Sequence, residues 1–105
     1  MPKIIEDCRS FRAGRAWGAL DLAEVDGATV RLHWTDQPYE WHVNDAPEAF
    51  VVLDGLVEMH YREGGEEKLV ELRPGSVFVA EAGDEHVARP RGEARILVVE
   101  RKGSI

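Results

Sequence analysis

The stretch from residue 50 to residue 83, FVVLDGLVEMHYREGGEEKLVELRPGSVFVAEAG, decides the fold class. Short runs of β-branched, aromatic and aliphatic residues alternate in it with turn signals such as Asp54-Gly55, Gly64-Gly65 and Pro74-Gly75. The signals recur at intervals of about 8–10 residues, which is the rhythm of an all-β sandwich or barrel. The paired glycines at 64 and 65 supply positive φ angles and predict a hairpin loop there.

The pattern within the runs supports the same fold class. In LVEMHY, Val57, Met59 and Tyr61 alternate with the three residues between them, which is the period of a half-buried strand. Nothing from residue 28 onward has a helical period with caps. The basic run RPRGEAR at 89–95 is interpreted as a solvated turn between strands. We therefore predict an all-β protein, either a closed barrel or a double-sheet sandwich.

Length and composition limit the organisation and the partners. A chain of 105 residues fits one domain with one modest core. Within that domain we expect residues 28–105 to form the barrel and residues 1–27 to form N-terminal strands or an arm. This arm is expected to pack on the barrel or to swap with a second copy. The net charge of −7 argues against nucleic acid as a partner, because neutralising phosphates needs a basic surface.

The sequence also bears on localisation. The longest apolar run, 49–53, is far shorter than the ~20 residues of a membrane span, so no membrane partner is expected. The N-terminus has no apolar signal-peptide region, and the lone Cys8 cannot form an internal disulfide. We therefore predict a cytoplasmic protein.

Several side chains suited to metal binding lie around the strand that begins near residue 48. His42 and Asn44 are two residues apart, so on an extended chain both side chains point to the same face. Glu48 follows the turn at 45–47, and His86 follows Gly83 at the start of a later strand. Two imidazoles and one carboxylate suit a divalent transition metal, and an open set of this kind suits iron or manganese.

The other histidines and the aromatic residues have plainer interpretations. His33 and His60 each lie between apolar neighbours, so both are expected to face away from the interior. The expected substrate pocket is lined by four aromatic residues, which could equally serve as core or dimer contacts: Trp34, Tyr39, Trp41 and Phe50.

At these residues the sequence resembles the cupin superfamily, in particular its small single-domain (cupin-2-like) members. The two cupin motifs are G-x5-H-x-H-x3,4-E-x6-G and G-x5-P-x-G-x2-H-x3-N. Residues 36–55 and 75–90 align with them without a forced gap, and the two segments agree at His42, Glu48, Gly55, Gly75, Gly83 and His86. The resemblance covers roughly residues 30 to 102.

This resemblance implies a double-stranded β-helix, or jelly-roll barrel, with a metal in its interior. Its ligands would be His42, Glu48 and His86, and Asn44 stands where cupins have their second histidine. An amide oxygen is a poorer ligand than imidazole for a borderline metal, so Asn44 would be a weak or water-mediated ligand. The implied cofactor is Fe, Mn, Zn or Ni. Alternatively, the site has no metal and binds an organic ligand directly.

Function remains open at this point, because one fold hosts many activities. One hypothesis is a metal-dependent oxygenase or isomerase that acts on a small polar substrate. The second is a binding module for a small-molecule ligand, and a third is a structural dimer whose cavity is filled by side chains. A homodimer is expected in each case, because a jelly roll of this size has sheet faces and edge strands to cover.

Overall fold

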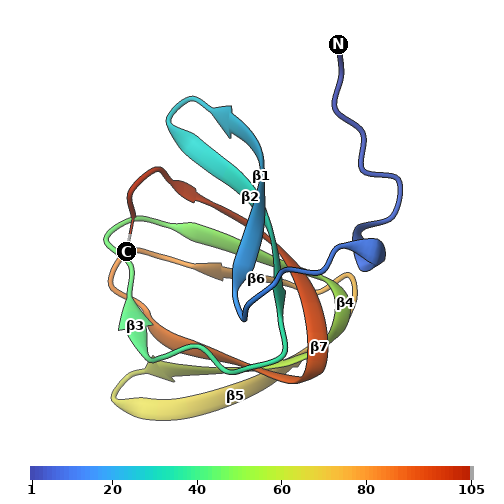
Figure 1. Cartoon of the computed structure of the whole chain (residues 1–105). Helices are drawn as coiled ribbons and strands as arrows, with labels where there is room; N and C mark the ends of the chain where they lie inside the picture. Colours follow the sequence, from blue (N-terminus) through green and yellow to red (C-terminus); the bar gives the residue numbers. More distant parts are fainter. Residues whose placement is uncertain (105) are drawn as a thin grey trace.

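The computed structural model describes residues 1–104, which fold into antiparallel strands with one short 3₁₀ helix (Figure 1). The elements in chain order are η1 (Cys8–Ser10), β1 (Gly18–Val25), β2 (Ala28–Thr35), β3 (His42–Val43), β4 (Glu48–Glu63), β5 (Glu66–Leu72), β6 (Val77–Ala80) and β7 (Glu85–Arg101). The predicted all-β class is confirmed. Ile105, the last residue of the predicted barrel range, lies outside the described residues.

Two long strands, β4 and β7, form the frame of the molecule. They pair from Glu48 opposite Glu100 at one end to Tyr61 opposite His86 at the other. β6 adds to the first half of β4 and β5 to its second half, whereas β2 adds to the second half of β7 and β3 to its first residues. The sheet order β1-β2-β7-β4-β5 therefore folds back on itself and encloses an interior (Figure 1).

Two of the predicted turns are bends inside the long strands β4 and β7. Asp54-Gly55 lies within β4, and the basic run 89–95 lies within β7 and is not a turn between strands. The register between the two strands shifts on both sides of Asp54. Gly55 has φ +87°, and a Cβ there would overlap the Glu93 carbonyl and lie 2.9 Å from the Ala94 Cα. Glycine is needed at Gly55 because the two strands touch where they bend.

The predicted hairpin loop at the paired glycines is confirmed. Glu63 pairs with Glu66, and between them Gly64 and Gly65 have φ +62° and +81°. Positive φ at both central residues matches the twist of the flanking strands, so β4 continues directly into β5.

The core lies between the two halves of the folded sheet. Val57 and Met59 are fully buried, as their alternation predicted. The buried cluster comprises Phe50, Val52, Val57, Met59, Leu72, Ala88, Ala94, Ile96 and Val98. Most of these residues come from β4 and β7, so the same two strands build the core and carry side chains to the site.

The N-terminal residues lie against the outside of the barrel before they enter it. Arg95 Nε donates to the Phe11 carbonyl at 2.9 Å, and β1 then joins the edge of β2. The first residues return toward β1, where Lys3 Nζ donates to the Leu22 carbonyl at 2.9 Å. Whether this arm swaps with another copy stays a prediction. Within residues 1–104, no helix is long and apolar enough to span a bilayer.

Candidate metal centre and ligand cavity

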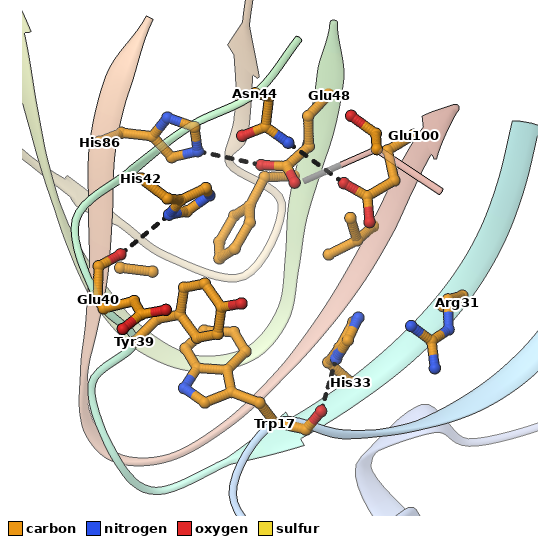
Figure 2. A pocket seen from close by; sticks show the side chains of 14 residues that line it. Trp17, Arg31, His33, Tyr39, Glu40, His42, Asn44, Glu48, His86 and Glu100 are labelled. Atoms are coloured by element: carbon orange, nitrogen blue, oxygen red, sulfur yellow. Dashed lines mark hydrogen bonds and ion pairs between the residues drawn. The ribbon is translucent and has the colours of Figure 1, made fainter. Parts of the chain in front are cut away.

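His42 and His86 are brought together by the pairing of β3 with β7. The two residues are direct cross-strand partners, and their ring centroids lie 4.3 Å apart. Partners of this kind project from the same face of a sheet. Here that face is the inner one, so both imidazoles enter the barrel interior (Figure 2).

Backbone carbonyls orient both imidazole rings. His42 Nδ1 lies 2.9 Å from the Glu40 carbonyl, and His86 Nδ1 lies 3.2 Å from the Asp84 carbonyl. A carbonyl can only accept, so each Nδ1 carries the proton, and Nε2 is the nitrogen left for the site. Histidine ligands of metals are commonly oriented in this way through the second ring nitrogen.

Glu48 begins β4 and is buried beside His86. Its Oε1 lies 3.2 Å from His86 Nε2, and the two side chains are 9% and 1% exposed. Burial opposes both charges. Hydrogen bonds nevertheless lower the pKa of Glu48 and, through Glu48 and the Asp84 carbonyl, raise the pKa of His86. Because Nδ1 already donates to a carbonyl, the Nε2–carboxylate contact needs a cation between the atoms, either a proton or a metal ion.

Asn44 follows β3 and is 2% exposed. Its Nδ2 donates to Glu100 Oε2 at 3.4 Å. Its Oδ1 is buried and, within residues 1–104, has no hydrogen-bond partner. A buried acceptor without a partner costs free energy, so this oxygen fits a bound ion or a ligand donor.

Glu100, near the end of β7, is a residue of the site that sequence reasoning missed. It pairs directly with Glu48 across the sheet and lines the cavity. Burial, together with the neighbouring Glu48 carboxylate, raises the pKa of Glu100 to about 7. Residues two apart on a strand share a face. The alternation of Glu100 with Ile96 and Val98, both of which are buried, therefore indicates that Glu100 faces the interior.

The cavity in front of these groups has a volume of about 390 Å³. Its lining residues come from β2, β3, β4 and β7 and from segments beside the strands: Trp17, Arg31, His33, Tyr39, Glu40, His42, Asn44, Glu48, Phe50, His86, Ala88, Val98, Glu100 and Ser104 (Figure 2). Two of the four predicted pocket aromatics, Tyr39 and Phe50, are among them.

The other two predicted pocket aromatics lie elsewhere. Trp34 is buried away from the cavity, and its indole Nε1 donates to Glu93 at 2.9 Å. The Trp41 ring stacks with Arg62, whose Cζ is 4.3 Å from the ring centroid. Neither tryptophan lines the cavity in the described part of the chain, so the pocket expectation fails for these two residues.

The prediction for His33 was wrong, because this side chain lines the cavity. His33 pairs with the fully buried Ile96 on the inner face, whereas Leu32 pairs with Leu97 on the outer face. Apolar residues therefore occupy both faces of β2, and alternation with apolar neighbours could not identify the inner one. His60 faces outward as expected, with Nδ1 3.4 Å from Glu67.

The donor set as a whole fits a divalent metal ion. One ligand atom from each of His42, Glu48 and His86 lies within 4.8 Å of the others. Two imidazole nitrogens with one carboxylate suit Fe, Mn, Zn or Ni, and the unpartnered Asn44 oxygen adds a further weak donor. Three protein ligands leave coordination positions open toward the cavity.

Comparisons with solved structures support the fold. A cupin-2 domain protein from Shewanella frigidimarina is 23% identical with a TM-score of 0.75, over 85% of this chain and 84% of that one. A cupin superfamily protein from Desulfitobacterium hafniense is 13% identical with a TM-score of 0.78, over 96% and 92%. Hydroquinone 1,2-dioxygenase PnpCD in complex with Fe³⁺ is 16% identical with a TM-score of 0.76, over 86% and 29%.

The chain therefore has the cupin fold, and the resemblance predicted from its motifs is confirmed at the level of the fold. No protein-family model matches the sequence, and no curated protein matches it.

Proposed function

We propose that this protein binds a divalent transition metal on His42, Glu48 and His86 and holds a small molecule beside it in the cavity. The convergence of one atom from each residue within 4.8 Å carries the proposal. The two imidazoles are already oriented by backbone carbonyls, so little ordering is needed for binding. Asn44 is proposed as a weak fourth ligand through Oδ1.

In this role His86 and Glu48 would hold the metal in place of the proton that lies between them when the site has no ion. A bound divalent ion would act as a Lewis acid and polarise an oxygen of the small molecule. Around it the chain supplies a buried apolar wall that includes Phe50, Ala88 and Val98. Asn44 Nδ2 and Glu100 stay hydrogen-bonded to each other and fix the amide orientation.

A metal-dependent oxygenase or isomerase is the catalytic form of this proposal. The iron-containing hydroquinone dioxygenase that shares the fold supports an oxygenase in particular. The alternative is a metal-free binding module in which the ligand itself contacts the two histidines. A purely structural role is disfavoured, because a cavity of about 390 Å³ is not filled by side chains.

Elemental analysis tests the metal proposal. Protein purified without added metal, and then reloaded with Fe, Mn, Zn or Ni, is expected to hold about one ion per chain. His42→Ala and Glu48→Gln should lose this ion, whereas His60→Gln, which changes a histidine outside the cavity, should retain it. Sub-stoichiometric metal that no reloading restores, and that neither substitution changes, would overturn the proposal.

Oxygen consumption separates an enzyme from a binding module. Metal-loaded protein would be mixed with a panel of small phenols, diketones and hydroxy acids in an oxygen electrode cell. Turnover that His86→Ala abolishes identifies an oxygenase. Tight binding without turnover at full metal occupancy identifies the module, and product formation without oxygen uptake identifies an isomerase.

We also propose a homodimer, based on the outer face of the sheet. Two rows of directly paired residues cross it: Ala23, Val30, Val99, Ala49 and Val79 in one, and Leu20, Leu32, Leu97, Val51 and Val77 in the other. All ten are apolar. Leu32 is fully buried, whereas Leu20, Val77 and Val79 are 38%, 58% and 60% exposed. Exposed apolar side chains gathered on one face usually mark an interface. Without charges it offers nothing to select an unlike partner, so a second copy fits best.

Light scattering tests the homodimer. Val77→Lys with Val79→Lys is expected to convert a dimer into a monomer, because the new charges would be buried at the interface. Leu69→Lys, at an exposed apolar position on β5 outside the two rows, is the matched control and should remain dimeric. A wild-type protein that is monomeric at high concentration would contradict the proposal.

A further inference from the structure

Arg31 lies on β2 at the end of the cavity away from the two site histidines (Figure 2). It pairs with Val98, which in turn pairs with Phe50, so it lies two strands from β4 on the inner face. Sheet spacings place its Cα roughly 12 Å from that of Glu48. A small molecule can therefore reach both ends of the cavity.

The guanidinium of Arg31 is only partly engaged by the protein. Nε donates to Asp21 Oδ1 at 2.7 Å, and Asp21 is an exposed side chain. Within residues 1–104, neither Nη group has a hydrogen-bond acceptor, and Arg31 forms no ion pair with Glu100. The two Nη groups of the planar guanidinium match the two oxygens of a carboxylate.

Two further polar side chains that line the cavity have atoms without partners. His33 Nδ1 donates to the Trp17 carbonyl at 3.0 Å, which leaves Nε2 as an acceptor. Trp17 Nε1 is buried and, among the described residues, has no acceptor. The unpaired donor, Trp17 Nε1, and the unpaired acceptor, His33 Nε2, fit a ligand that carries both an oxygen acceptor and a hydroxyl group.

From this geometry we infer that Arg31 forms a carboxylate subsite, and that the ligand is a small organic acid with a second oxygen that reaches His42, Glu48 and His86. This inference rests on the proposed metal and ligand cavity and names its ligand class. A carboxylate fits better than a phosphate, because Arg31 is the only arginine or lysine lining the cavity within residues 1–104. At the Arg31 end of the cavity a phosphate dianion would have one positive charge to compensate its two negative ones, with the Glu100 carboxylate nearby.

The test compares acids with their neutral amides by isothermal titration calorimetry. The full chain is titrated with lactate, mandelate, lactamide, mandelamide and inorganic phosphate, both in excess Mn²⁺ and in chelator. At least one acid should bind about tenfold more tightly than its amide. Arg31→Gln should reduce this preference to about one, and Arg31→Lys should keep part of it.

The controls separate this inference from the metal proposal. Asp21→Asn removes the exposed partner of Arg31 and should leave the acid preference intact. Arg31→Gln should still bind Mn²⁺, because Arg31 is not among the metal-binding residues. If the wild type binds no Mn²⁺ but prefers acids through Arg31, only the metal proposal fails. Three results would show that the carboxylate subsite is wrong. In the first, Mn²⁺ binds but Arg31→Gln leaves the preference for acids over amides unchanged. In the others, no acid binds, or phosphate binds more tightly than every acid.

Discussion

His42 and His86 face each other as direct partners of β3 and β7, with their ring centroids 4.3 Å apart. Backbone hydrogen bonds hold this arrangement on both sides. The Tyr39 amide donates to the Ala88 carbonyl at 3.0 Å, and the Gly83 amide donates to the Asn44 carbonyl at 3.0 Å. The chain therefore fixes the position of His42 through its backbone and leaves the imidazole Nε2 free for a ligand.

His42→Ala should consequently abolish tight metal binding without unfolding the protein. We expect metal affinity to fall by about 100-fold or more, since even outer-shell partners of metal ligands contribute 10–100-fold. Chelator competition measures the affinity, and urea unfolding of the metal-free protein measures the stability. A stability loss equal to that of a core truncation would show that His42 is structural instead.

Asn44→His should change metal preference. An imidazole in place of the amide adds a nitrogen donor, which favours Zn²⁺ and Ni²⁺ over Mn²⁺. We expect the affinity ratio of Zn²⁺ to Mn²⁺ to rise by about tenfold or more in paired competition titrations. Asn44→Ala is the control and should weaken Mn²⁺ binding several-fold, because it removes the unpartnered Oδ1. Unchanged selectivity in the histidine variant would mean that residue 44 does not reach the ion.

Local spacing was enough to predict the all-β class, and the resemblance to the two cupin motifs indicated the central residues of the site. The turn signals marked most of the strands, and the match to the motifs pointed to His42, Glu48 and His86, which the structure brings within 4.8 Å. These features depend on short segments, whose geometry follows from residue order. Such features are the ones a single sequence encodes most directly.

The features that the sequence did not predict depend on how distant strands pair, which the spacing of residues does not encode. Glu100 reaches the site because β7 pairs with β4 in a register set far from either motif. His33 faces inward because β2 is apolar on both faces, so its pattern does not distinguish them. Asp54-Gly55 predicts a turn but forms a bend inside a long strand, because both structures use the same residue types.

Gly55→Ala should strongly destabilise the barrel. Its φ of +87° is strained for any residue with a Cβ, and that Cβ would contact the backbone of Glu93 and Ala94. We expect a loss of about 3 kcal/mol or more in the free energy of unfolding, measured in urea. Gly64→Ala has a similar positive φ but open space around it, and should cost about 1 kcal/mol. Equal losses in the two variants would contradict the close approach of the strands.

His33 should make the stability of the protein sensitive to mildly acidic pH. Burial lowers the pKa of His33 below its ordinary value and outweighs its hydrogen bond to the Trp17 carbonyl. The unfolded chain takes up the proton near pH 6.5, whereas the folded protein does so only at lower pH. The free energy of unfolding therefore falls as the pH drops below 6.5 and through the folded pKa.

The measurement compares wild type with His33→Gln in urea unfolding at pH 7.5 and pH 5.5, both in chelator. All other titrating groups are shared, so the difference between the two proteins isolates His33. Wild type should lose more stability than the variant between these two pH values, because only the wild type has an imidazole at position 33 that takes up a proton on unfolding. His60→Gln provides a matched control for the substitution itself, since it removes a histidine that lies outside the cavity. Parallel curves for wild type and His33→Gln would show that the cavity does not hold His33 neutral.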